Sequence, residues 1–149
     1  VFLHDYELSQ YDRWKDNFPD SRIDDGRTTY DMALANSDLV IGGWNTTTYL
    51  ESMSSDIPTV IFWNPDFFEL REEAAVLLES LKKVGIYHTG PAEAAKHVEK
   101  IWNDIEGWWD RSLVQAARKT VSENYARKPM EVLTQIEMVL RDTIVMKSR

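Results

Sequence analysis

Two short apolar runs with a helix-length segment between them constrain the fold of this chain most strongly. Residues 38–43, Asp-Leu-Val-Ile-Gly-Gly, form a run of branched apolar side chains that ends in glycines, and residues 57–63 form a second run. Such runs are typical of strands buried on both faces of a parallel sheet. Residues 46–54 between them predict a helix. Together these segments predict a βαβ unit, which we expect to cross over right-handed.

The rest of the chain alternates strands with helices at first and then contains helices alone. Short strands are predicted at residues 1–4, 21–24 and 86–88. Helices, the first of them either a helix or an ordered loop, are predicted at residues 8–17, 28–36, 70–84, 91–102, 112–125 and 130–146. This order favours an α/β fold: a Rossmann-like, doubly wound parallel sheet with extra C-terminal helices, residues 111–149, packed back on it.

Length and the first residues bear on domain organisation. A chain of 149 residues suits one domain, so residues 1–149 are predicted to form a single domain. The chain opens at Val1 directly in an apolar run, and the predicted strands are too few for a complete sheet. We therefore interpret it as a fragment of a longer, two-domain protein whose N-terminal elements are missing.

Composition excludes several classes of protein and site. The absence of cysteine excludes a disulfide scaffold and a cysteine-ligated metal site, and the three histidines lack metal-ligand spacing. A net charge of −8 disfavours nucleic acid and anionic membrane surfaces as partners. No apolar run approaches the ~18 residues of a transmembrane segment. We expect a cytoplasmic protein, with a peripheral position at the inner membrane face left open.

The turn after the first run of the βαβ unit carries the residues best suited to bind a ligand. Ligands of open parallel sheets bind outside the carboxyl ends of the strands. Gly42 and Gly43 permit close approach of a ligand to the backbone there. The following helix start offers unpaired N–H groups with partial positive charge, and an amide and three hydroxyls add to them. These side chains, which predict a phosphate or diphosphate site, are Asn45, Thr46, Thr47 and Thr48.

The same residues also have a purely structural interpretation. Thr48 and Glu51 have the spacing of a capping box, and Asn45 or a threonine is suited to cap the helix. The turn lacks the lysine of a Walker loop and the glycine pattern of the dinucleotide fingerprint. Residue chemistry alone favours phosphate binding and simple capping about equally.

Several stretches of the chain occur together in a known family. They are Asn-Thr-Thr-Thr-Tyr-Leu-Glu at 45–51, Ile-Pro-Thr-Val-Ile-Phe-Trp-Asn-Pro at 57–65 and Trp-Trp at 108–109. In these, the chain resembles a bacterial family of transferases that are tied to surface-carbohydrate synthesis and are similar to the C-terminal half of GT-B glycosyltransferases. The resemblance extends over residues 4–125. Its Phe-Trp-Asn-Pro and Trp-Trp pieces are more specific than the turn, which recurs widely among GT-B enzymes.

The resemblance implies the donor-binding half of a two-domain glycosyltransferase. The phosphates of a nucleotide-sugar donor would meet Thr46, Thr47 and Thr48, and Glu51 would hold the ribose. No cofactor or metal is expected, because helix N-termini and basic side chains stabilise the leaving phosphate in such enzymes. A carbohydrate or lipid-linked acceptor, and the catalytic base of an inverting member, would belong to the missing N-terminal half. This fragment alone is therefore expected to bind a nucleotide without catalysing transfer.

Further polar residues follow the second run of the βαβ unit. Asn64 and Asp66 are candidates to contact the sugar or the base, and an ordinary Asn-Pro turn is the alternative. Arg71 is a candidate to hold a phosphate through two parallel hydrogen bonds. Its alternative is a surface ion pair with Glu69, which contributes ~0–1 kcal/mol.

Histidine and tryptophan residues give weaker indications. His4 and Asp5 end the first predicted strand and are weak candidates for acid–base catalysis, and His88 ends another strand. His97 lies in the middle of a predicted helix and is interpreted as solvated. Three tryptophans are predicted to pack the C-terminal helices onto the sheet rather than to stack on a sugar: Trp102, Trp108 and Trp109.

Three functions remain open at this stage. The first is a glycosyltransferase module that binds a nucleotide-activated sugar. The second is a nucleotide-sugar epimerase of the same architecture, which also needs acidic residues aimed at the sugar ring. The third is a non-catalytic, Rossmann-like interaction module. Binding of a nucleotide separates the first two from the third.

Overall fold

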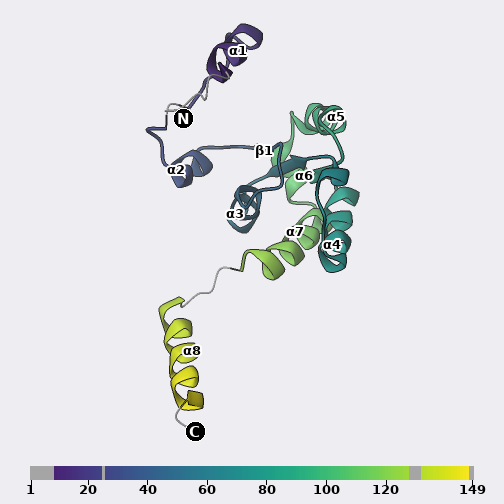
Figure 1. Ribbon diagram of the computed structural model, residues 1–149. Coiled ribbons are helices and arrows are strands. Elements are labelled where there is room, and N and C mark those ends of the chain that lie inside the picture. Colours follow the sequence, from purple (N-terminus) through teal and green to yellow (C-terminus); the bar gives the residue numbers. More distant parts are fainter. Residues whose placement is uncertain (1–8, 25, 128–131, 148–149) are drawn as a thin grey trace. The chain divides into compact units, whose positions relative to one another are not determined.

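The computed structural model describes residues 9–24, 26–127 and 132–147, which form two units, Val1–Ser37 and Asp38–Arg149 (Figure 1). Helices and parallel strands make up the described chain. In order they are α1 (Gln10–Asn17), α2 (Tyr30–Ala35), β1 (Val40–Gly42), α3 (Thr48–Ser54), β2 (Thr59–Phe62), the 3-10 helix η1 (Pro65–Phe67), α4 (Glu72–Lys83), β3 (Tyr87–His88), α5 (Pro91–Ile101), α6 (Ile105–Trp109), α7 (Ser112–Tyr125) and α8 (Val132–Lys147).

The first unit contains two short helices. No side chain of α1 is buried, and its Trp14 ring packs on Phe18 at a centroid distance of 5.1 Å. The strand predicted at residues 21–24 is absent, and the ammonium of Lys15 donates a 2.6 Å hydrogen bond to the carbonyl of Ser21 instead. Helix α2 is capped by Thr29, whose hydroxyl accepts from the N–H of Met32. Helix α2 therefore begins at Tyr30, two residues after the start predicted at residue 28.

A three-stranded parallel sheet in the order β1-β2-β3 organises the second unit. Val40 pairs with Thr59 and Ile61 pairs with Tyr87. The β1–α3–β2 segment is thus the predicted βαβ unit, and the mixed α/β class is confirmed. Central strand β2 is buried on both faces, as predicted. The same prediction is wrong for β1, because it is an edge strand of the described sheet and its Ile41 is 53% exposed.

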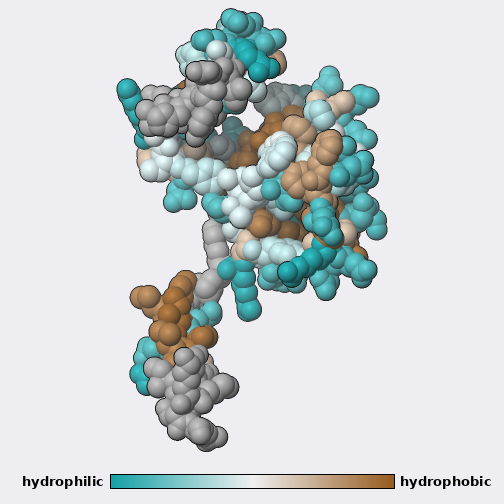
Figure 2. Space-filling view, viewed as in Figure 1, coloured by the Kyte–Doolittle hydropathy of each residue, from teal (hydrophilic) through white to brown (hydrophobic). Residues whose placement is uncertain are grey.

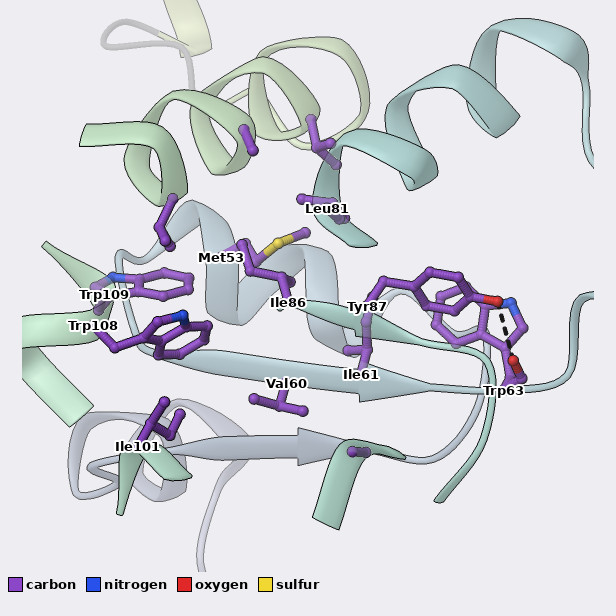
Figure 3. Close-up of a cluster of buried hydrophobic side chains, with 14 residues drawn as sticks. Met53, Val60, Ile61, Trp63, Leu81, Ile86, Tyr87, Ile101, Trp108 and Trp109 are labelled. Carbon is purple, nitrogen blue, oxygen red and sulfur yellow. Dashed lines mark hydrogen bonds between the residues drawn. The ribbon is translucent and has the colours of Figure 1, made fainter. Parts of the chain in front are cut away.

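Helices pack against the sheet and against one another to form the core (Figure 3). Helix α3 contacts β1 and β2, α4 contacts β3, and α7 lies along α3 and α4. In Figure 3, Met53 and Leu81 lie on one side of β2 and Ile101 lies on the other. The largest fully buried side chains are Trp108, Tyr87, Met53, Ile61, Leu81, Ile86 and Val60.

Local signals set the ends of the helices around the sheet. Helix α4 ends in a Schellman motif, in which Ile86 N–H bonds Leu81 O and Gly85 N–H bonds Lys82 O. Gly85 has φ +85°, as its predicted position after the helix requires. Helix α6 lies between two predicted helices, where no element was predicted, and the Asp104 carboxylate caps it by accepting from Gly107 N–H.

A buried arginine joins α3 to the C-terminal helices. Arg118 of α7 is 7% exposed, and its Nη1 donates a 2.7 Å hydrogen bond to the Met53 carbonyl at the end of α3. Its Nε lies 3.3 Å from the carboxylate of Asp56, which also accepts from the indole N–H of Trp109. Asp56 has φ +61°, a conformation in which its N–H also bonds Met53 O. The packing of α7 on α3 therefore has a specific polar link.

The domain predictions are tested only in part of the chain. Helix α7 packs on α3 and α4. Packing of the last helix on the sheet and the single domain at residues 1–149 stay predictions. Among the residues that the structure describes, no helix is both long and apolar enough to span a membrane. The outer side of α4 and α5 is largely hydrophilic in Figure 2, in keeping with exposed Glu72, Glu73, Lys82 and Lys83.

Replacement of Arg118 by methionine tests the polar link. We predict that Arg118→Met lowers the free energy of unfolding by about 1–3 kcal/mol, because it removes the buried donor to the Met53 carbonyl and the charged partner of Asp56. Urea unfolding measures the change. The exposed neighbour Lys119 provides the control, and Lys119→Met should change stability by less than about 0.5 kcal/mol. Equal losses in the two variants would contradict the assignment.

Candidate functional site

The predicted phosphate-binding turn lies between β1 and α3, at the carboxyl end of the parallel sheet. Residues 43–47 form the turn, and α3 begins at Thr48. The hydroxyls of Thr46 and Thr48 share a hydrogen bond of 2.6 Å. The side chains of Thr46, Thr47 and Thr48 are exposed, so the predicted hydroxyl cluster lies on the surface of the molecule.

The capping interpretation of the threonines finds little support in this geometry. Thr47 occupies the N-cap position of α3 in a helical conformation, and its side chain makes no capping hydrogen bond. Thr48 is already the first helical residue, so it cannot form the predicted capping box with Glu51. Asn45 accepts a 3.4 Å hydrogen bond from the hydroxyl of Tyr49. The side chain of Thr47 therefore does not cap the helix.

The glycines of the turn have a packing role. A Cβ atom at Gly42 would lie 3.3 Å from the Ile61 side chain, and one at Gly43 would lie 3.1 Å from the Phe62 ring. Both distances are tight for side-chain contacts, so β2 packs closely against this segment. The glycines are accounted for by this packing without any ligand.

Aromatic side chains gather beside the turn. Trp44 is 61% exposed and packs edge-on against Phe68, with a centroid distance of 5.1 Å. Phe68 in turn contacts Trp63, which also packs on Tyr49 and Tyr87. The cluster brings the segment after β2 next to the turn after β1. The family resemblance had drawn attention to Trp63 through the Phe-Trp-Asn-Pro stretch. No pattern in the sequence indicated that the rings of Trp44 and Phe68 would be in contact.

The hydroxyl of Tyr87 and the indole N–H of Trp63 are buried in this cluster. The Tyr87 hydroxyl donates a 3.1 Å hydrogen bond to the Trp63 carbonyl, drawn as the dashed line in Figure 3. The indole N–H of Trp63 has no acceptor among the described residues. Burial raises the pKa of the Tyr49 hydroxyl, and the nearby Tyr125 of α7 adds to this shift. The carboxyl end of the sheet thus combines an apolar wall with a buried donor that lacks a partner.

The polar candidates after β2 are exposed. Asn64 caps η1, since its side-chain oxygen accepts from the N–H of Asp66 at 3.0 Å, as the Asn-Pro turn interpretation predicts. Arg71 stands at the N-cap of α4 without a side-chain capping bond. Within the described part of the chain, the alternative ion pair between Arg71 and Glu69 does not form at 4 Å or less.

The remaining candidates divide between described and undescribed residues. Glu51 lies in the first turn of α3 with an exposed side chain. His4 and Asp5, the weak catalytic candidates, lie outside the described residues. In the described ranges, no group of three or more histidine, aspartate or glutamate side chains is arranged to hold a metal ion.

A second group of residues, which sequence reasoning missed, surrounds His97. The imidazole packs on Trp108 and His88, and it lies so close to Gly85 that a Cβ there would fall 2.3 Å from its Cε1 atom. His97 is therefore partly buried, and its interpretation as a solvated residue is wrong. Burial lowers its pKa from 6.5 to about 4, and the positive charges of His88, Lys100 and Arg111 add to this effect.

The tryptophans follow the packing prediction with one exception. Trp108 and Trp109 are buried, and their indole N–H groups donate to Val84 O and Asp56 Oδ1. Trp102 is 64% exposed, so its predicted packing role is wrong. It is the C-cap residue of α5 and follows the buried Ile101.

Comparison with family models gives one match. The model described as "LIC12162 family transferase" matches residues 1–140, most of the chain. The chain belongs to the LIC12162 family of transferases. Its expected membership of a transferase family is thereby confirmed. No curated protein and no solved structure matches the chain.

The pKa of His97 predicts a pH dependence of stability for this LIC12162 family member. The unfolded chain takes up a proton near pH 6.5, which the folded chain resists until about pH 4. Stability contributed by the neutral imidazole is therefore complete above about pH 6.5 and is lost as the pH falls toward about 4.

Urea unfolding at about pH 7.5 and about pH 5 measures this effect. We predict that His97→Gln loses less stability between the two conditions than the original chain, because it has no imidazole to protonate. The melting curve at the higher pH serves to check that the variant is folded. The same loss in both proteins would contradict the burial of a neutral His97.

Proposed function

We propose that this LIC12162 family transferase is the donor-binding half of a GT-B-like glycosyltransferase, which transfers a sugar from a nucleotide-activated donor to a surface-carbohydrate acceptor. The observation that carries the proposal is the turn after β1. It places three threonines at the carboxyl end of a parallel sheet, and the N-cap side chain makes no capping bond. The finer, doubly wound Rossmann-like arrangement is part of this proposal.

In the proposed complex, the donor phosphates meet the threonine turn. Hydroxyls of Thr46, Thr47 and Thr48 and the amide of Asn45 supply donors to the phosphate oxygens. Helix α3 has only seven residues, so these side chains matter more than its small macrodipole. As the bond between the sugar C1 and the phosphate oxygen breaks, the same donors stabilise the charge that develops on the leaving nucleotide.

The surrounding residues are assigned to the rest of the donor. Glu51 lies one turn into α3, where its carboxylate is placed to accept hydrogen bonds from the ribose hydroxyls. Asp66, the amide nitrogen of Asn64 and the guanidinium of Arg71 are assigned to the sugar and the phosphates. The exposed face of Trp44, fixed by Phe68, offers an apolar surface for the base.

Catalysis in this proposal needs partners beyond the donor site. A carbohydrate or lipid-linked acceptor and the catalytic base belong to a second half of the enzyme, and the transfer uses no metal or cofactor. His4 and Asp5 stay weak candidates for acid–base work. The proposed location is the cytoplasm, with a peripheral position at the inner membrane face. Membership of a transferase family favours transfer over epimerisation and over a non-catalytic module.

A calorimetric titration with CMP, UDP, GDP and dTDP tests the donor site. We expect one nucleotide to bind, and the double replacement Thr46→Ala/Thr47→Ala to weaken its binding by about tenfold, because two donors to the phosphates are lost. Melting curves should show that the variant stays folded, since these hydroxyls do not cap α3.

Thr120→Ala provides the matched control. Its hydroxyl lies on the exposed side of α7 and bonds only the Ala116 carbonyl. Nucleotide affinity should be unchanged in this variant. An affinity that is equally unchanged in the Thr46→Ala/Thr47→Ala variant would remove the phosphate role of the turn.

A further inference from the structure

A pocket of about 640 Å³ lies between the end of α4, the second half of α5, and α6 with the start of α7. It has no lining residue in common with the threonine turn or with residues 64–71. Its floor is formed by the buried Trp108 and Ile101. In Figure 3 these two side chains lie toward the tail of β2, whereas Trp63 lies beyond its arrowhead. The pocket is therefore separate from the proposed donor site.

The walls of the pocket are strongly basic, although the chain has a net charge of −8. Four cationic side chains line it, against the single carboxylate of Asp104. That carboxylate already caps α6 through Gly107 N–H. Among the described residues, none of the four cations forms an ion pair. They are Lys82, Lys83, Lys100 and Arg111.

The N-terminus of α7 and the imidazole of His97 also line the pocket. The first residues of the 14-residue helix α7, Ser112, Leu113 and Val114, line the pocket, and the N-cap residue Arg111 makes no side-chain capping bond. His97 also lines it, and its buried Nε2 atom has no hydrogen-bond partner among the residues that the structure describes. Cations that converge without a counter-charge repel one another, and this repulsion is relieved when an anion enters.

We propose that this pocket binds a small, soluble molecule that carries a phosphate or diphosphate group. A guanidinium supplies paired donors to phosphate oxygens, ammonium groups supply charge, and a first helical turn supplies N–H groups. A volume of about 640 Å³ is that of a site for a small molecule. This binding site is independent of the proposed donor site, and the two proposals can fail separately.

Calorimetric titration with inorganic pyrophosphate at constant ionic strength tests the proposal. We expect saturable binding, and a loss of at least about tenfold in Lys100→Gln/Arg111→Gln, because two of the converging cations are removed. The control Lys119→Gln/Arg127→Gln removes the same charge from exposed positions outside the pocket and should bind as the original chain does. Thr46→Ala/Thr47→Ala should also bind normally.

The outcomes separate this site from its alternatives. Lack of saturable binding, or equal weakening in the Lys119→Gln/Arg127→Gln control, would overturn the proposal. Weakening only in the threonine variant would assign the pyrophosphate to the donor turn and would also overturn it. If Lys100→Gln/Arg111→Gln does not fold, Lys83→Gln replaces it, with a smaller loss of affinity expected.

The imidazole of His97 gives a second readout by nuclear magnetic resonance. Electrostatic interactions with His88, Lys100 and Arg111 oppose the protonation of this ring and lower its pKa. A bound anion cancels part of that charge, so the pH midpoint of the His97 resonance should rise when pyrophosphate is added. An unchanged midpoint at saturating pyrophosphate would place the anion outside the pocket.

Discussion

The contact of Arg118 with the end of α3 is the interaction on which the rest of the second unit depends. In the described part of the chain the sheet has three short strands, so helices supply most of the core. Arg118 donates a hydrogen bond to the last turn of α3 and forms an ion pair with Asp56. The carboxylate of Asp56 also accepts a hydrogen bond from the indole N–H of Trp109. One carboxylate thus links α6 and α7 to the βαβ unit. Removal of Arg118 takes a buried donor from the Met53 carbonyl and the charged partner from Asp56, which keeps its hydrogen bonds with Trp109 and Gln115.

This arrangement determines what the carboxyl end of the sheet can do. Helix α3 is held at its C-terminus by α7, and its N-terminus follows the threonine turn. The turn therefore stands on a fixed helix, while its hydroxyls remain on the surface. The aromatic contact between Trp44 and Phe68 brings the segment after β2 to the same edge. A rigid base with exposed donors is the arrangement that phosphate binding requires.

The sequence predicted the parts of the fold that depend on local patterns. The β-branched runs located β1 and β2, and Gly85 and Pro91 marked the end of α4 and the start of α5. Exposure of Ile41 was not predictable, since a run of branched side chains looks the same in an edge strand and in a central one. The start of α2 was placed two residues too early, because Thr28 and Thr29 before it are adjacent and equally suited to cap a helix.

Contacts between distant residues escaped prediction for a different reason. Nothing in the pattern around His97 indicates that its ring will lie against Gly85 and Trp108, twelve and eleven residues away along the chain. The four cations of the pocket come from three separate segments, so no short motif contains them. For the candidate donor site, the sequence predicted the turn itself, whereas its aromatic neighbours depend on how β1 and β2 pair.

The most direct test of the donor site is the backbone amide spectrum of the chain, recorded with and without CMP, UDP, GDP or dTDP. Amide signals report the residues whose surroundings a ligand changes, even when the ligand binds weakly. We predict that one nucleotide shifts the signals of residues 42–51 and 64–68 most strongly. A nucleotide that leaves these signals unchanged and shifts those of residues 82–85 and 111–114 would contradict it, because the donor would then occupy the basic pocket instead of the threonine turn.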